Sequence, residues 1–358
     1  MSKVKSIDYL FLFMVLLLSA IGLVMVFSAS PTMGLKVGDA FYFIKRHLFY
    51  LVLGFMALYY GLRLDLEKLK SLAEIIFLFS FLFLLLVFIP GVGRKVLGAA
   101  RWIDLGLLSF QPSELIKFSM VLYAAKWLAK EKISSFQRFL FPLFLLGLVA
   151  LPILKQPDLG TVVVLGMTVL SLLFLAGIDM LPLVGLLLVV GATVLGLAFS
   201  APYRLRRLTA YLNPWQDPQG AGFQIIQSLL AVGSGGLWGL GLGASRQKFF
   251  YLPQQFTDFI FAILCEELGF VGGVTVIILF LLFTLRGFRV ALRVSDSFRA
   301  YLAGGLVSWL SFQALINILV VIGLIPTTGI PLPFISYGGT STIINLFAAG
   351  IILNISRK

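Results

Sequence analysis

The sequence predicts an all-α integral membrane protein, a polytopic bundle of about ten transmembrane helices. Of its 358 residues, 60% are hydrophobic and only 12% are charged, and the mean hydropathy is +1.04. A soluble chain carries roughly 25% charged residues. The apolar residues fall in uninterrupted runs near the ~20 residues that a helix needs to cross the hydrocarbon core, and not in the short alternating segments of an outer-membrane barrel. These observations exclude a water-soluble fold and favour a helical bundle.

Charged residues and Gly/Pro clusters separate the apolar runs and set their approximate ends. The predicted spans are residues 7–29, 45–62, 73–90, 112–129, 139–154, 159–177, 180–199, 259–285, 300–323 and 342–355. The first run is longer than the ~7–15 apolar residues of a signal-peptide core, so we expect a retained first helix. We expect a single transmembrane domain over residues 1–358, with a large extracytoplasmic loop, residues 200–258, between the seventh and eighth helices.

The loop charges predict the orientation of these helices. An even number of spans places both termini on one side of the membrane. The short loops after the second, fourth and eighth spans are rich in Lys and Arg, and such loops face the cytoplasm. Both termini are therefore predicted to be cytoplasmic. Loops 91–111 and 200–258 also carry cations although they lie outside, and this excess predicts an anionic ligand.

The overall charge and the cysteine content exclude several other functions. The chain has 28 basic and 15 acidic residues, a net charge of +13. In a membrane protein these cations lie in loops, where anionic lipid rather than nucleic acid is the expected counter-charge. The single cysteine, Cys265, cannot form an intrachain disulfide, and the single histidine, His47, has no partner at metal-ligand spacing. Zinc and thiol chemistry are therefore not expected.

Asp258 stands where the loop 200–258 meets the eighth predicted helix. An acid at such a junction either caps the helix and complements its dipole or carries a function, and position alone does not separate the two. In the same loop, the glycine-rich residues 233–243 precede Arg246 and Lys248. Glycine backbone beside cations can cradle a phosphate, although such segments between membrane helices more often permit tight turns and close packing.

Other polar residues lie at the predicted depth of the membrane, where their cost makes them functional candidates. Glu114 and Lys117 share one face of the fourth helix at i and i+3 and can pair as ions. Asp158 stands at the start of the sixth helix. The structural alternatives are a buried ion pair and a helix cap.

The segment from Thr327 to Ser341 interrupts the apolar pattern with turn-forming residues. Non-helical backbone at membrane depth is tolerated only where it is buried in protein or lines a polar cavity. The segment is predicted to lie on the same side as Asp258 and the outer cations. We therefore predict one outward-facing polar cavity that unites these features.

At these residues the chain resembles the SEDS family of bacterial shape, elongation, division and sporulation proteins, essentially from end to end. Four motifs carry the resemblance: Phe110 to Glu114, Gln156 to Thr161, Thr257 to Ala262, and Pro331 to Gly339. The Asn213-Pro214-Trp215 start and the Ser245-Arg246-Gln247-Lys248 stretch resemble the FtsW division and sporulation branch more than the RodA elongation branch.

The resemblance implies a ten-helix peptidoglycan glycosyltransferase of the bacterial cytoplasmic membrane that polymerises lipid II. Its implied partners are a class B penicillin-binding protein, which is a transpeptidase, and other membrane proteins of the divisome or elongasome. Asp258 matches the essential aspartate of the family. Positions where polar residues line the family's central cavity are matched by Arg101, Gln111, Glu114, Lys117 and Asp158. Ser336 and Gly338, in the last motif, are expected to shape the same cavity.

The chemistry of glycan polymerisation suggests a role for each kind of residue. The 4-hydroxyl of the acceptor must lose a proton, for which Asp258 is the expected general base. The growing charge on the leaving diphosphate needs cations, for which Arg101, Lys117 and either Arg246 or Lys248 are candidates. Direct displacement from an α-linked donor gives a β-linked chain, so no covalent nucleophile is required. The sequence contains no all-protein metal cage, and a divalent cation, Mg²⁺ or Mn²⁺, held on the diphosphate is left open.

The chain also departs from the family pattern, and two other functions remain open. Many relatives have Glu directly after the Pro of the Tyr-Leu-Pro segment and His or Gln before the Thr, where this chain has Gln254 and Phe256. A second acid or metal ligand is therefore not carried over to this segment. A lipid II flippase would show the same polar groove without needing a base. A scaffold that recruits a transpeptidase would use Asp258 only as a dispensable cap.

Overall fold

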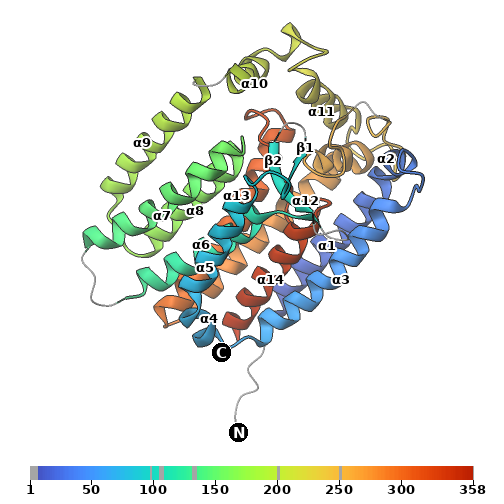
Figure 1. The fold of residues 1–358 in the computed structure, drawn as a ribbon. Helices are drawn as coiled ribbons and strands as arrows, with labels where there is room; N and C mark the ends of the chain where they lie inside the picture. The colour runs from blue at the N-terminus through green and yellow to red at the C-terminus, as the bar shows by residue number, and fades with distance from the viewer. Residues whose placement is uncertain are drawn as a thin grey trace.

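The computed structural model describes residues 7–96, 99–104, 109–130, 135–199, 202–249 and 252–357. These residues form a bundle of long helices (Figure 1). Both termini lie at one end of the bundle. A small sheet and several short helices lie at the other end, which we call the loop end.

Among the described residues, ten long helices correspond to the ten predicted spans, and the predicted fold class is confirmed. They are α1 (Tyr9–Ala29), α3 (Tyr42–Arg63), α5 (Ala73–Leu86), α6 (Pro112–Leu128), α7 (Ser135–Lys155), α8 (Leu159–Leu175), α9 (Met180–Phe199), α12 (Ile260–Arg293), α13 (Ser297–Val321) and α14 (Gly339–Ser356). Within the described part of the chain, α1, α7, α12, α13 and α14 are by themselves long and apolar enough to cross a membrane.

Helix α13 lies in the core of the bundle, where it packs against α6, α8 and α12. Its Trp309 is completely buried. Helix α14 packs along α3, and a side chain at Gly350 would collide with the α3 backbone at Leu58. Small residues at such positions let helix backbones approach closely in a membrane, where no hydrophobic effect drives association.

A three-stranded antiparallel sheet lies at the loop end, and the sequence analysis did not predict it. Strands β1 (Gly93–Val96), β2 (Ala99–Asp104) and β3 (Ser109–Phe110) pair in the order β1-β2-β3. The strands are short and lack a clear alternation of apolar and polar residues, so the usual sequence signal is missing. The other short elements are α2 (Pro31–Leu35), α4 (Leu66–Ser71), α10 (Pro202–Leu212), the 3₁₀ helix η1 (Pro214–Gln216) and α11 (Phe223–Ser234).

Helix α12 is longer than predicted and is broken near its start. Gly269 has φ +69° and ψ −167°, a conformation that only glycine adopts readily. The segment 236–241 lies against this break: Phe270 N–H donates to the Gly236 carbonyl at 2.8 Å, and Leu240 N–H donates to the Glu266 carbonyl at 3.0 Å. The glycine-rich segment therefore satisfies the backbone groups that the break exposes. This supports the close-packing interpretation of those glycines rather than the phosphate cradle.

Candidate active site

A polar cavity of about 450 Å³ opens at the loop end, between the sheet, α3, α11, the residues before α12 and the loop before α14. Four of the sequence-predicted site residues line it: Arg101, Gln111, Asp258 and Gly338. The predicted union of Asp258 with the loop 327–341 in one cavity is therefore what the structure shows.

Backbone hydrogen bonds fix the segment that carries Asp258. The Asn317 side chain of α13 donates through Nδ2 to the carbonyl oxygens of Asp258 and Ile330, both at 2.7 Å. The Tyr337 N–H donates to the Phe256 carbonyl at 2.9 Å. The N-cap residue of α12 is Phe259, without a side-chain cap bond. Asp258 is thus held by its main chain, one residue ahead of the helix cap.

Glycine at position 329 leaves space beside the Asp258 carboxylate. Gly329 has φ +77°, and a Cβ there would lie 3.6 Å from Oδ2 of Asp258. A larger side chain would be strained by that backbone and would extend into the cavity next to the carboxylate. At position 329 the loop before α14 therefore presents backbone rather than a side chain to Asp258.

Helix α3 contributes a cation that the sequence analysis missed. Arg46 lines the cavity and donates from Nη1 to the Tyr42 hydroxyl at 2.6 Å. Burial and the nearby Tyr50 raise the pKa of Tyr337, which also lines the cavity, while Arg46 opposes that shift. Tyr337 therefore stays neutral and can donate or accept hydrogen bonds. The sequence signal for Arg46 was its place at the start of the second span.

Arg101 binds the turn that precedes α8, and Asp158 caps that helix. Arg101 donates from Nε to the Gln156 carbonyl at 2.8 Å and from Nη2 to the Pro157 carbonyl at 2.5 Å. Asp158 caps α8, accepting from Thr161 N–H at 3.1 Å and from its hydroxyl at 2.9 Å. Asp158 is 3% exposed, so the structure gives it the capping position and leaves Arg101 on the cavity wall.

Glu114 and Lys117 form the predicted ion pair, at 2.8 Å, with both side chains 2% exposed. Lys117 also donates to Oε1 of Gln313 at 2.6 Å, and Gln313 donates in turn to the Pro331 carbonyl at 3.0 Å. The pair therefore lies beneath the cavity and reaches its wall through Gln313. The structure does not place Lys117 on the cavity surface, because its ammonium is already enclosed by acceptors and by the Trp309 ring.

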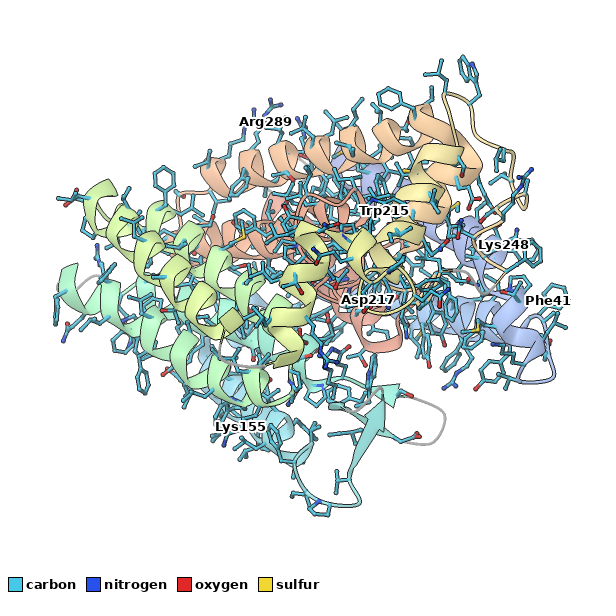
Figure 2. All side chains as sticks on the ribbon, turned by 90° about the horizontal axis from the view of Figure 1, so that it is seen from above. Phe41, Lys155, Trp215, Asp217, Lys248 and Arg289 are labelled. Carbon is cyan, nitrogen blue, oxygen red and sulfur yellow. The ribbon has the colours of Figure 1, made fainter. Side chains whose placement is uncertain are left out.

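Arg246 and Lys248 lie outside the cavity, in contrast to the expectation that they bind the diphosphate there. Lys248 is 6% exposed and its Nζ lies 3.3 Å from Oε1 of Glu267. The Arg246 N–H donates to Oε1 of Glu266 at 2.9 Å. Seen from above, Lys248 lies toward Phe41, whereas Asp217 lies over the middle of the bundle (Figure 2). The Lys248–Glu267 and Arg246–Glu266 contacts attach the loop to α12.

Ser336 is buried next to the cavity and does not line it. Its hydroxyl donates to the Thr257 carbonyl at 2.6 Å and accepts from the Leu332 N–H at 2.8 Å. Gln111 lines the cavity, and its N–H donates to the Thr340 hydroxyl at 3.0 Å. The Ser336–Thr257 contact joins the loop before α14 to the residues before α12, and the Gln111–Thr340 contact joins the start of α14 to the residue before α6.

The described residues allow a direct test of whether a metal ion fits. They contain no group of three or more His, Cys, Asp or Glu side chains placed to hold one. Asp258 is the carboxylate on the described cavity wall. Mg²⁺ is commonly held by one or two carboxylates together with substrate phosphates, so Asp258 with a diphosphate ligand fits that mode.

The helical bundle, with a cavity lined by polar and charged side chains at one of its ends, defines a polytopic membrane protein with a candidate ligand site. The chain belongs to the FtsW, RodA and SpoVE family, whose model, described as "Cell cycle protein", matches residues 8–358.

Two curated relatives cover almost the whole chain. Stage V sporulation protein E of Bacillus subtilis is 47% identical over 99% of this chain and 98% of that protein. A protein named "Probable peptidoglycan glycosyltransferase FtsW" from Geobacter sp. (strain M18) is 44% identical over 100% of this chain and 99% of that protein. The predicted resemblance to the FtsW branch is confirmed.

Two solved structures share the fold. A chain in the structure described as "Structural coordination of polymerization and crosslinking by a peptidoglycan synthase complex" superimposes with a TM-score of 0.82, at 32% identity and 98% coverage of both chains. The rod shape determining protein RodA of Thermus thermophilus gives a TM-score of 0.74, at 30% identity, over 98% of this chain and 97% of that one.

Proposed function

We propose that this protein is a peptidoglycan glycosyltransferase that polymerises lipid II, with Asp258 as the general base. The observation that carries the proposal is the position of the Asp258 carboxylate on the wall of a polar cavity that Arg46 and Arg101 also line. The names of the FtsW relatives support the activity. The cavity lies at the end of the bundle opposite the termini, as cytoplasmic termini and an extracytoplasmic site in the bacterial inner membrane require.

The reaction balances with a single base and no covalent intermediate. Asp258 takes the proton from the acceptor 4-hydroxyl as that oxygen forms a bond to the anomeric carbon of the donor sugar. The bond between that carbon and the diphosphate oxygen breaks, and undecaprenyl diphosphate leaves with the electron pair. Attack opposite the leaving group inverts an α-linked donor into a β-linked glycan.

The arginines on the cavity wall are suited to stabilise the leaving group. A guanidinium binds phosphate oxygens in a bidentate fashion and stays charged at every working pH. Arg101 is oriented by the carbonyls of Gln156 and Pro157, so its geometry is set before substrate arrives. A divalent cation held between Asp258 and the diphosphate would add electrostatic stabilisation of the leaving oxygens. Glu114, Lys117 and Asp158 act beneath the surface as positioning residues.

The proposed domain and partners follow from the same arrangement. The site draws residues from α3, the sheet, α11, the residues before α12 and the loop between α13 and α14, so the membrane domain works as one unit with residues 200–258 as part of its active site. A class B penicillin-binding transpeptidase is the proposed partner, as in a complex that coordinates polymerization and crosslinking. Lipid II is the proposed substrate for both donor and acceptor sites.

The decisive experiment compares the wild type with Asp258→Asn in polymerisation of labelled lipid II, in the presence of the transpeptidase partner. The matched control is Asp217→Asn, since Asp217 is an exposed acid of the same loop whose side chain accepts from the Ala221 N–H. Loss of the base is expected to slow polymerisation by about 100-fold or more, with lipid II binding and complex formation unchanged and the control active.

Other outcomes would overturn the proposal in distinct ways. Normal polymerisation by Asp258→Asn excludes Asp258 as the base. A wild-type protein that makes no glycan with its partner but moves lipid II across vesicles is a flippase. A variant that loses only the association with the transpeptidase supports the scaffold function.

A further inference from the structure

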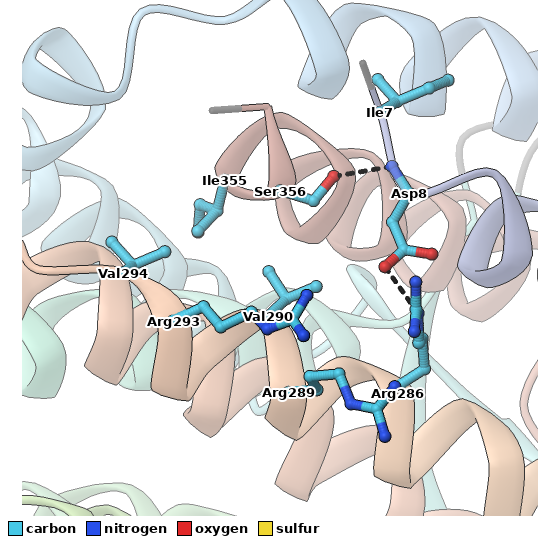
Figure 3. Close-up of a pocket in the computed structure, with 9 residues that line it drawn as sticks. All are labelled: Ile7, Asp8, Arg286, Arg289, Val290, Arg293, Val294, Ile355 and Ser356. Carbon is cyan, nitrogen blue, oxygen red and sulfur yellow. Dashed lines mark hydrogen bonds and ion pairs between the residues drawn. The ribbon is translucent and has the colours of Figure 1, made fainter. Parts of the chain in front are cut away.

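A second cavity, of about 260 Å³, lies at the end of the bundle that carries the termini (Figure 3). It is formed by the residues before α1, the last turns of α12 and the end of α14. Its lining combines three arginines of α12, Arg286, Arg289 and Arg293, with apolar side chains such as Val290, Ile7 and Ile355. The proposed reaction does not use this cavity, because Asp258 lies at the opposite end of the molecule.

The three arginines come from one side of α12. Their spacing of i, i+3 and i+7 places them along one helical face, and all three line the cavity. Asp8 is the single acid in the lining. Its Oδ2 pairs with Arg286 at 2.7 Å, while its Oδ1 accepts from the Phe11 N–H at 3.0 Å. The lining therefore carries two more positive than negative charges, and Asp8 is already used to cap α1 and to hold Arg286.

The lining of the cavity favours a ligand that has both a phosphate and an apolar part. Guanidinium groups bind phosphate oxygens well, and the apolar lining residues offer nothing to a small inorganic anion. One to two turns earlier on α12, Leu282 and Leu285 are 43% and 57% exposed. A phospholipid covers both kinds of surface, with its head group between the arginines and an acyl chain along α12.

We propose that this cavity binds the head group of an anionic phospholipid of the surrounding membrane, with Arg289 as the phosphate ligand and Arg293 adding to the positive charge of the lining. Basic pockets at the ends of transmembrane helices are suited to anionic head groups, because each cation near the membrane surface adds to the attraction. The Asp8–Arg286 ion pair forms the wall of the site and fixes the start of α1 against α12.

The test is native mass spectrometry of the purified full chain in detergent micelles that contain either phosphatidylglycerol or phosphatidylcholine. The test variant is Arg289→Gln with Arg293→Gln. The matched control is Arg63→Gln with Lys68→Gln, which removes two exposed cations from the same end of the bundle outside the cavity. Wild type and control are expected to retain phosphatidylglycerol over phosphatidylcholine. The test variant is expected to bind it about 5-fold more weakly for each arginine lost.

Two further measurements keep the proposal decidable. Arg289→Lys with Arg293→Lys keeps both charges and is expected to retain the preference, while thermal unfolding checks that each variant is folded. The proposal is overturned if the Gln pair binds phosphatidylglycerol as the wild type does, or if the control weakens equally. It is also overturned if soluble glycerol phosphate displaces the lipid at equal concentration, since that identifies a site for a free phosphate, or if an acidic peptide does so, since that identifies a protein-binding site.

Discussion

The hydroxyl of Ser336 donates a 2.6 Å hydrogen bond to the carbonyl oxygen of Thr257, the residue that precedes Asp258. These residues are 79 positions apart in the sequence. The same hydroxyl accepts from the Leu332 N–H, so one buried side chain joins the loop before α14 to the residues that begin α12. The position of the proposed base therefore depends on a loop that belongs to a different part of the chain.

Ser336→Ala is expected to lower both stability and polymerisation. It leaves a buried carbonyl and a buried N–H without a partner, which costs about 1–3 kcal/mol, and it loosens the residue next to Asp258. Polymerisation rate and thermal unfolding in detergent measure the two effects. Ser336→Thr keeps the hydroxyl and is expected to restore most of the rate. Equal activity of the Ala and Thr variants would contradict a positioning role.

Removal of Lys117 alone is expected to be more harmful than removal of the whole ion pair. Lys117→Met leaves the Glu114 carboxylate buried without its cation, at a cost of about 3–5 kcal/mol. The double variant Glu114→Gln with Lys117→Met removes both charges and is expected to be closer to the wild type. Unfolding free energies of the two single variants and the double variant form a cycle. Additive losses in that cycle would show that the pair is not coupled.

Gly269→Ala is expected to disrupt the break in α12. The backbone conformation at this residue costs a non-glycine residue about 1–3 kcal/mol, and the new Cβ would lie 2.5 Å from the Leu237 carbonyl oxygen. Gly147→Ala is the matched control, because nothing lies within 4 Å of its added Cβ in α7 and alanine favours a helix by up to about 1 kcal/mol. Thermal unfolding of both variants decides the point. A Gly269→Ala protein as stable as the control would mean that the break is dispensable.

Lys248→Met distinguishes a structural lysine from one that binds substrate. Its contact with the buried Glu267 predicts a loss of about 3–5 kcal/mol in the free energy of unfolding, with an unchanged KM for lipid II in the folded fraction. Addition of Glu267→Gln is expected to recover stability. A raised KM with unchanged stability would show that Lys248 binds the diphosphate, as the sequence suggested.

The helices could be predicted from the sequence because the membrane imposes a length on each apolar run. The predicted end of the fourth span, residue 129, lies one residue beyond the last residue of α6, Leu128. Local rules also held: Pro112 occupies the first turn of α6, Asp158 caps α8, and Glu114 pairs with Lys117 across one turn. Each of these depends on residues at most four positions apart.

The residues that line the cavity were less predictable, because they are selected by contacts between elements that are distant in the sequence. In the sequence, Arg46 is an ordinary cation near the start of a membrane helix. Only the packing of α3 beside α14 brings it to the cavity. Lys248 reads as a free cation of an outer loop, yet the break at Gly269 places it against Glu267. The local sequence places Arg46 at the start of a span, but it does not show which of the two cations reaches the cavity.

The sequence by itself determined that this is a polytopic membrane protein with a polar site near Asp258, since the length of apolar runs and the cost of charge in hydrocarbon are local properties. Only the tertiary structure decided which cations share a cavity with Asp258 and which form buried ion pairs. The physical reason is that a long charged side chain has the same local preferences in either place, and its partner is selected by helices that meet only when the bundle has formed.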